Sequence, residues 1–266
     1  MDHAENYVQG NKEAWEEAFE RKSPEWGSDI VQRVKTEKLP FLSRELAVEL
    51  EQLNLTGKTI GQFCCNNGRE LLSIVKQGAR EGVGFDIAEN QVQFANGIAA
   101  ALNMHCTFVA TDILQIDASY DDRFDLLLIT IGSLCWFKDL SLFFNRVARC
   151  TKKHGVVLVH EQHPVTNMLA IPGEENYDEQ RPGKLVNSYF QNTWIESSGM
   201  PYISGQAYAS KTFTSYTHSL SAIITAAIES GLQVCNLQEF DRDLSGDFTP
   251  MENKGIPLSY ILKLRK

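Results

Sequence analysis

The sequence is 266 residues long, with 25 Lys and Arg against 34 Asp and Glu and therefore a formal net charge of −9. This length allows one large α/β domain or two smaller ones, and a hydrophobic content of 43% is sufficient for a substantial core. The negative charge argues against a general nucleic-acid binder, because it repels phosphate backbones.

Three features of the sequence bear on the compartment in which the protein works. The longest apolar run, residues 126–137, is interrupted by polar residues and is too short for a membrane span of about 20 residues. Residues 1–5 have neither the basic nor the apolar segment of a signal peptide. The six cysteines form no C-x-x-C pair, which is typical of free thiols in a reducing compartment. We therefore expect a soluble cytoplasmic protein with no metal site.

The first 58 residues are predicted to form an N-terminal helical flap. A helix over residues 11–21 places Trp15 and Phe19 on one face, and Ser23-Pro24 ends it. A second helix starts at Ser43, which is a suitable N-cap, and ends before residue 57.

From residue 59 the pattern becomes strand, turn and helix, repeated. Apolar runs predict five strands, at residues 59–65, 82–86, 106–110, 124–131 and 156–160. Helical spacing of apolar residues predicts the helices between them, at residues 69–77, 92–102 and 140–151. Strands that alternate with helices indicate a parallel, doubly wound sheet.

The pattern loosens over residues 165–215, which are rich in Gly, Pro, Asn, Ser and Tyr. We expect a cap insertion here, with strands at 185–194 and 206–216, because long segments between core elements are usually functional. A helix at 219–230 and strands at 234–240 and 258–264 follow. The prediction is an α/β protein with a Rossmann-like, mostly parallel seven-stranded sheet in residues 59–266.

Ligands of open α/β sheets bind at the carboxyl ends of the strands. Here those ends carry a small polar loop at residues 64–68, then Asp86, Asp112, residues 130–132 and residues 160–163. No G-x-G-x-x-G sequence is present, so the dinucleotide fingerprint is missing. A carboxylate such as Asp86 can accept hydrogen bonds from both ribose hydroxyls, although acidic residues at strand ends are common.

Five segments, taken together and in order, resemble the class I S-adenosylmethionine-dependent methyltransferases of the small-molecule type. They are Ile60-Gly61-Gln62-Phe63-Cys64-Cys65-Asn66-Asn67-Gly68, Gly84-Phe85-Asp86-Ile87, Thr111-Asp112-Ile113, Phe124-Asp125-Leu126-Leu127-Leu128-Ile129 and Lys153-His154-Gly155-Val156-Val157. The similarity covers residues 59–164, and a weaker similarity extends to the last helix and strands.

The cofactor loop departs from the family pattern at three positions. Gln62 stands where the family has an acidic residue, and Cys64 and Asn66 replace the first two glycines. Asn tolerates positive φ better than other side chains. We therefore interpret the loop as a variant that still binds S-adenosyl-L-methionine.

The resemblance implies a role for each matching segment. The loop approaches the methionine moiety, the second strand end the ribose, the third the adenine, and the fourth forms the floor beneath the methyl group. The cofactor residues that it implies are Cys64, Cys65, Asn66, Asn67, Gly68, Asp86, Ile87, Asp112, Ile113, Thr130 and Ile131. Trp15 and Asn11 either fold over the cofactor or pack in the core. Arg69 either pairs with the cofactor carboxylate or is solvated.

Methyl transfer from a sulfonium is an in-line displacement, so the protein mainly aligns the two reactants. A base is needed only where the attacking atom must lose a proton. His163, followed by Pro164, is the first candidate base, and His160 and His218 are further candidates. The alternative is that these histidines only hold the cap in place.

The predicted function is methyl transfer to an O or N atom of a small molecule, by a monomer or homodimer with no nucleic-acid or membrane partner. Aromatic residues of the predicted cap suit a partly apolar acceptor or an amine, or else form a small core of their own. The alternatives are a non-catalytic S-adenosylmethionine-binding or regulatory protein with this fold and, less favoured, an NAD-dependent oxidoreductase.

Overall fold

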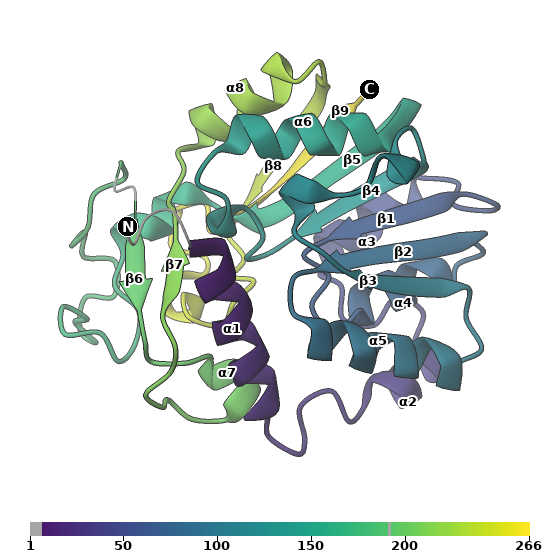
Figure 1. Ribbon diagram of the computed structural model, residues 1–266. Coiled ribbons are helices and arrows are strands. Elements are labelled where there is room, and N and C mark those ends of the chain that lie inside the picture. Colours follow the sequence, from purple (N-terminus) through teal and green to yellow (C-terminus); the bar gives the residue numbers. More distant parts are fainter. Residues whose placement is uncertain (1–6, 191–192) are drawn as a thin grey trace.

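A seven-stranded sheet forms the centre of the chain, and its strand order is β3-β2-β1-β4-β5-β9-β8. Our computed structural model describes residues 7–190 and 193–266. Strands β1 to β5 are parallel, whereas β9 runs antiparallel to both β5 and β8 (Figure 1). This arrangement confirms the predicted mostly parallel, doubly wound sheet. The sheet strands are β1 (Thr59–Phe63), β2 (Glu81–Asp86), β3 (Cys106–Ala110), β4 (Phe124–Thr130), β5 (Thr151–Gln162), β8 (Gln233–Phe240) and β9 (Ser259–Arg265).

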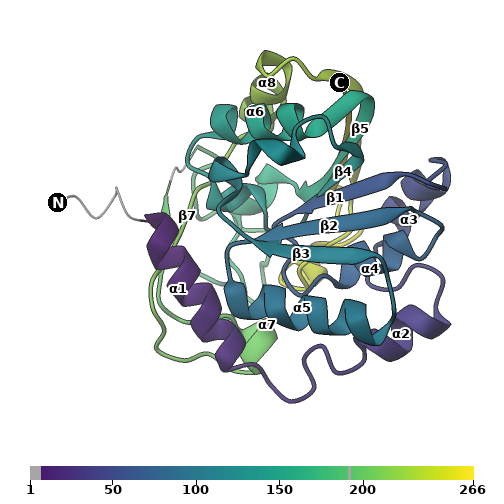
Figure 2. The same cartoon turned by 45° about the vertical axis from the view of Figure 1, so that its right-hand side comes forward.

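Helices pack on both faces of the sheet (Figures 1 and 2). Helices α2 to α5 share one apolar cluster with the sheet, and α6 and α8 share the other. Chain order reverses between β1 and β4, and open α/β sheets bind their ligands in the crevice beside such a reversal, at the carboxyl ends of the strands. The helices are α1 (Tyr7–Glu20), α2 (Ile30–Thr36), α3 (Arg44–Glu51), α4 (Arg69–Val75), α5 (Glu89–Ala101), α6 (Leu140–Cys150), α7 (Pro201–Ser204) and α8 (Leu220–Glu229).

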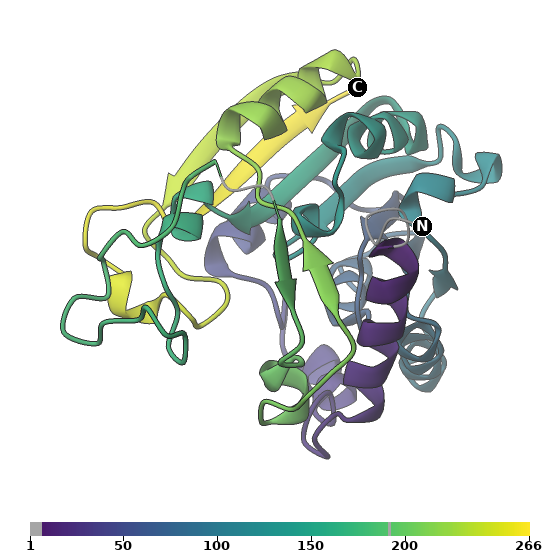
Figure 3. The same cartoon turned by 60° about the vertical axis from the view of Figure 1, so that its left-hand side comes forward.

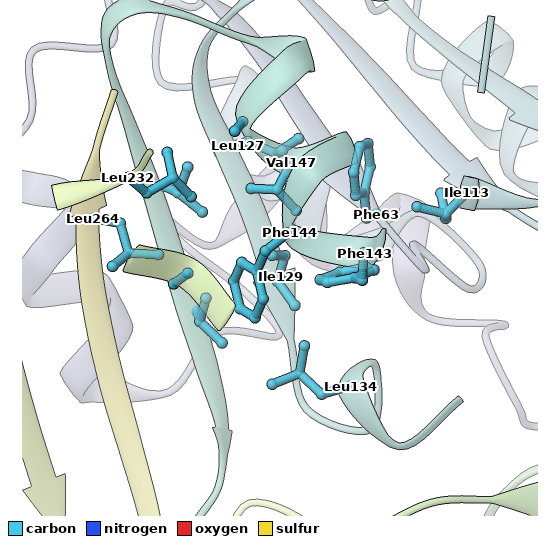
Figure 4. Packing of buried hydrophobic residues seen from close by; sticks show 14 of the residues in the cluster. Phe63, Ile113, Leu127, Ile129, Leu134, Phe143, Phe144, Val147, Leu232 and Leu264 are labelled. Atoms are coloured by element: carbon cyan, nitrogen blue, oxygen red, sulfur yellow. The ribbon is translucent and has the colours of Figure 1, made fainter. Parts of the chain in front are cut away.

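The core between the sheet and α6 is built from large side chains. Phe63 and Ile129 point from β1 and β4 toward Phe143, Phe144 and Val147 of α6 (Figure 4). These five side chains are completely buried. Burial of one such side chain stabilises the fold by about 1.5–3 kcal/mol, so this layer fixes the strand ends that frame the crevice.

The cap is a short hairpin that lies beside α1, away from the main sheet (Figure 3). Its strands β6 (Trp194–Glu196) and β7 (Phe213–Ser215) are three residues each, so the strands predicted at 185–194 and 206–216 are wrong in length. Pro201 and two glycines at positive φ, Gly199 and Gly205, turn the chain out of the extended conformation between them. Residues 185–190 are not a strand, and residues 191–192 lie outside the described residues.

The predicted N-terminal flap contains parts that pack differently. Helix α1 packs on the cap, where Asn11 donates to Thr214 O and accepts from Thr214 N, both at 2.8 Å. Helix α2, which the sequence pattern did not reveal, and α3 pack under the sheet, and Ser43 caps α3 as expected. Residues 1–5, on which the signal-peptide argument rests, lie outside the described residues. In the described residues, no helix is long and apolar enough to cross a membrane.

Candidate active site

The loop after β1 adopts an unusual backbone conformation. Cys64, Asn66 and Gly68 have φ angles of 52°, 50° and 75°, so every second residue of the loop is left-handed. Asn66 has the positive φ that we expected, whereas cysteine has no preference for this region and is strained there. A side chain at Gly68 would lie 2.4 Å from Phe108 Cζ, which allows only glycine. The loop thus keeps the backbone conformation of a glycine-rich loop, although Gly68 is its single glycine.

Asp86, at the end of β2, ties this loop to the sheet. Its carboxylate accepts hydrogen bonds from Asn66 N at 2.8 Å and Ala88 N at 3.0 Å, one on each oxygen. Burial raises the pKa of Asp86, but these hydrogen bonds oppose the increase. The side chain remains partly accessible, and each oxygen keeps a lone pair for a further donor. A pair of vicinal hydroxyls fits this arrangement.

Asp112 and Ile113 lie at the end of the neighbouring strand, β3. Asp112 accepts from Leu114 N at 2.9 Å and from Gln115 Nε2 at 3.2 Å, and so caps a short 3-10 helix, Ile113–Gln115. Ile113 is only 4% exposed and belongs to the core cluster of α6. Their predicted contacts with an adenine ring stay predictions, and Ile113 also has a packing role.

Gln62, which stands where the family has an acidic residue, belongs to a polar cluster. Gln62 Nε2 donates to Glu70 Oε2 at 2.7 Å and to Thr130 Oγ1 at 3.2 Å, and Thr130 Oγ1 donates to Glu70 Oε2 at 3.0 Å. Thr130 therefore uses its hydroxyl inside the protein. In the described part of the chain, the buried Gln62 Oε1 and Asn67 Nδ2 have no protein partner. One acceptor and one donor next to the loop suit the ammonium and carboxylate of an amino-acid moiety.

Glu161, near the end of β5, is a site residue that the sequence analysis missed. Its carboxylate accepts from the backbone N–H groups of Gly132, Ser133 and Leu134 at 2.7–2.9 Å. Burial raises the pKa of Glu161 to about 7. The available signal was its register: Glu161 is on the same strand face as Val157 and Val159, which are completely buried.

Each of the three candidate histidines has different partners within the protein. His160 is buried and its Nε2 lies 3.4 Å from Ser43 Oγ on α3, and burial lowers the pKa of His160 to about 4. His163 Nδ1 accepts from Val165 N at 3.1 Å, and its Nε2 lies 2.8 Å from Glu239 Oε1. Both ring nitrogens of His163 thus face protein groups, which favours a capping role over base catalysis.

His218 contacts the loop after β4 from the cap side. Its Nε2 lies 2.9 Å from the carbonyl oxygen of Phe137 and donates to it. Burial lowers the pKa of His218, so the ring is neutral at neutral pH. The ring also lines a surface groove between α6 and α8, together with Lys138 and Ser221, and this groove does not include the loop after β1.

The cap reaches the crevice through aromatic side chains. Trp15 of α1 packs edge-to-face on Trp136 and Phe213, with ring centroids 5.4 and 5.5 Å apart. Tyr202 of α7 accepts a hydrogen bond from Asn66 Nδ2 at 3.4 Å, directly above the loop after β1. Trp15 thus packs on aromatic neighbours, while its predicted position over the cofactor stays a prediction. Tyr202 makes a contact that sequence analysis did not predict.

Residues 60–155 match the family model of a methyltransferase domain. These residues span β1 to the start of β5 and include the loop at residues 64–68, Asp86, Asp112 and the loop after β4. The chain has the fold of the class I S-adenosylmethionine-dependent methyltransferases. No sequence match was found among curated proteins.

Solved methyltransferase structures share the fold at low sequence identity. An S-adenosylmethionine-dependent methyltransferase from Mesorhizobium loti is 18% identical, with a TM-score of 0.64 over 86% of this chain and 100% of that one. Geranyl diphosphate C-methyltransferase from Streptomyces coelicolor, solved with S-adenosyl-L-homocysteine, is 14% identical, with a TM-score of 0.57 over 91% and 84%. The [4+2]-cyclase SpnF is 12% identical, with a TM-score of 0.53 over 84% and 80%. The fold therefore also supports chemistry other than O- or N-methylation.

Proposed function

We propose that this protein binds S-adenosyl-L-methionine and transfers its methyl group to an O or N atom of a small molecule. The observation that carries the proposal is the loop at residues 64–68. It keeps positive φ at Cys64, Asn66 and Gly68, although only one of the three is glycine. A strained backbone persists where the surrounding structure holds it, and such strain clusters at ligand sites.

The residues around this loop fit the parts of the cofactor. Asp86 would accept the ribose hydroxyls and Asp112 the adenine amine. The backbone of residues 64–68 would hold the methionine moiety near the orphan atoms of Gln62 and Asn67. When bound, the sulfonium supplies an activated methyl group whose leaving group departs neutral. The protein then has to align the acceptor and exclude water.

The cap and α1 are the parts of the chain that we propose to select the acceptor. Trp15, Trp136 and Tyr202 lie between α1, α7 and the loop after β4, where they offer apolar faces for a small molecule. His160 and His163 are engaged within the protein, so alignment rather than a histidine base is the main contribution that we propose.

Calorimetric titration with S-adenosyl-L-homocysteine, with NAD as a control ligand, tests this proposal. We expect micromolar binding of the former alone. Asp86→Ala should weaken that binding at least tenfold, because it removes the hydroxyl acceptor and frees Asn66 N. The matched control is Asp117→Ala, since Asp117 also accepts a backbone N–H, from Ser119 at 2.8 Å, but outside the crevice. Absence of binding to the wild-type protein would overturn the proposal.

A further inference from the structure

The loop after β4 is held from two sides. From below, Glu161 accepts hydrogen bonds from the N–H groups of its first residues, 132–134. From above, Tyr216 N donates to Cys135 O at 2.7 Å, and His218 Nε2 donates to Phe137 O at 2.9 Å. The loop therefore joins the sheet to the cap, and Glu161 is its anchor on the sheet side.

The hydrogen bonds of Glu161 distinguish positioning from base catalysis. Oε1 accepts from Ser133 N at 2.7 Å and Leu134 N at 2.9 Å, and Oε2 accepts from Gly132 N at 2.8 Å. Consecutive N–H groups that converge in this way form an anion-binding nest, here filled by the protein's own carboxylate. With its oxygens occupied and only 6% of the residue exposed, Glu161 is poorly placed to take a proton from an acceptor.

Among the described residues, the groups that donate to the Glu161 carboxylate are all backbone N–H groups: those of residues 132–134, and that of Gln162, whose N lies 3.3 Å from Oε2. No salt bridge to Glu161 occurs within residues 7–190 and 193–266. The titratable groups that face it are the thiols of Cys64 and Cys135 and the phenol of Tyr260. Burial raises the pKa of each of these three groups, so all of them are neutral around pH 7. The charge of an ionised Glu161 is thus compensated by hydrogen bonds from the backbone rather than by a positively charged side chain.

We propose that Glu161 is a positioning residue: its ionised carboxylate fixes the backbone of residues 132–134 and thereby the floor of the cofactor site. The link to the cofactor rests on the proposed function, whereas the link between Glu161 and the loop does not. With Gln162 N, four N–H groups share the four acceptor sites of the carboxylate. A protonated carboxyl has an O–H donor in place of one acceptor site, so it cannot keep all four N–H groups bonded. Because burial raises the pKa of Glu161 to about 7, the loop should loosen between pH 8 and pH 6.

Backbone amide NMR of the wild-type protein tests the loop alone and needs no ligand. We expect the amide shifts of Gly132, Ser133 and Leu134 to titrate together with a midpoint near pH 7. In Glu161→Gln this common transition should be absent. Shifts that stay constant from pH 8 to pH 6, or that move with unrelated midpoints, would overturn the proposal. The titration of the wild-type protein decides the question even if the variant does not fold.

Titration with S-adenosyl-L-homocysteine tests the link to the site. Glu161→Gln should lower its affinity at pH 8 by about tenfold, because one N–H then faces an amide NH₂. The affinity of the wild-type protein should fall from pH 8 to pH 6, and that of the variant should not. The matched control is Glu49→Gln. Glu49 is also 6% exposed, but it bonds Gln238 Nε2 at 2.6 Å and Lys263 Nζ at 3.2 Å, away from the loop.

These measurements separate two kinds of failure. A wild-type protein that binds no S-adenosyl-L-homocysteine overturns the proposed function, while the amide titration still decides the role of Glu161. A wild-type protein that binds it as tightly as Glu161→Gln does, at both pH values, overturns the positioning role and leaves the proposed function in place. An equal loss of affinity in Glu49→Gln would also overturn it, since a general loss of stability would then explain the effect.

Discussion

The sheet and the cap are stabilised in different ways. The sheet is buried between two large apolar clusters, and each of its strands pairs with neighbours over several residues. The cap is a hairpin with three residue pairs, attached to α1 by Asn11 and by a small cluster around Ala14, Ala18 and Phe213. The part that we expect to hold the cofactor is thus rigid. The part that we expect to meet the acceptor is held by a much smaller buried cluster, so we expect it to open at a lower free energy than the sheet.

Gly68→Ala should have the largest effect on stability, and it should destabilise the part of the protein that contains the main sheet. The new Cβ would lie 2.4 Å from Phe108 Cζ in a residue with φ of 75°, so the loop or Phe108 must move. We expect a loss of about 3 kcal/mol in the free energy of unfolding, measured with urea. Gly97→Ala in α5 is the control. Among the described residues, no atom outside the adjacent backbone of the helix lies within 4 Å of its Cβ position, so this helical change should stabilise the protein by about 0.5–1 kcal/mol.

Asn11→Leu should affect the cap and leave the sheet intact. It removes both hydrogen bonds to Thr214 and leaves a backbone N–H and C=O unpaired, at a cost of about 2 kcal/mol. Amide hydrogen exchange should show faster exchange at residues 213–215 and unchanged rates in β4 and β5. Gln9→Leu is the control, because within residues 7–190 and 193–266 Gln9 bonds only the exposed side chain of Glu13. Equal loss of protection in cap and sheet would show that the two halves unfold as one unit.

His160→Gln should have a smaller effect, on the pH dependence of stability, because His160 lies where β5 meets Ser43 at the start of α3. Burial lowers the pKa of His160 from 6.5 to about 4, so the folded protein favours the neutral ring. The unfolded chain takes up this proton first as the pH falls, so stability is lost between pH 6.5 and pH 4. From pH 7 to pH 5.5 the wild-type protein should lose about 1 kcal/mol more than the variant, measured by urea unfolding. The same loss in both proteins would contradict the neutral, buried histidine.

Sequence reasoning succeeded where local pattern and tertiary packing agree. The apolar runs from Phe124 to Ile129 and from Cys106 to Ala110 form strands of the main sheet, and Ser43 caps α3 as its type and position suggested. The positive φ of Asn66 followed from the tolerance of asparagine for that conformation. Each of these features has its physical cause within a few residues of the chain.

The rest depends on contacts between distant segments. The left-handed φ of Cys64 is not a preference of cysteine and follows from the loop as a whole, which Asp86 holds by way of Asn66 N. The role of Glu161 depends on a loop almost 30 residues earlier, which donates N–H groups that no local pattern reveals. The cap strands were predicted too long because Gly and Pro positions, rather than apolar alternation, decide where the chain turns there.

The position of β9 has a consequence for the order in which the protein can assemble. Strand β9 follows β8 in the chain but lies between β5 and β8 in the sheet, with Tyr260, Leu262 and Leu264 completely buried. Strand β8 therefore has no native partner in the sheet until β9 has been synthesised. During translation, the early parallel strands can pair among themselves, while the edge of β5 stays open until residues 259–265 arrive. Completion of the sheet is thus a late step of synthesis, and until then the edge of β5 is a strand edge that another chain could pair with.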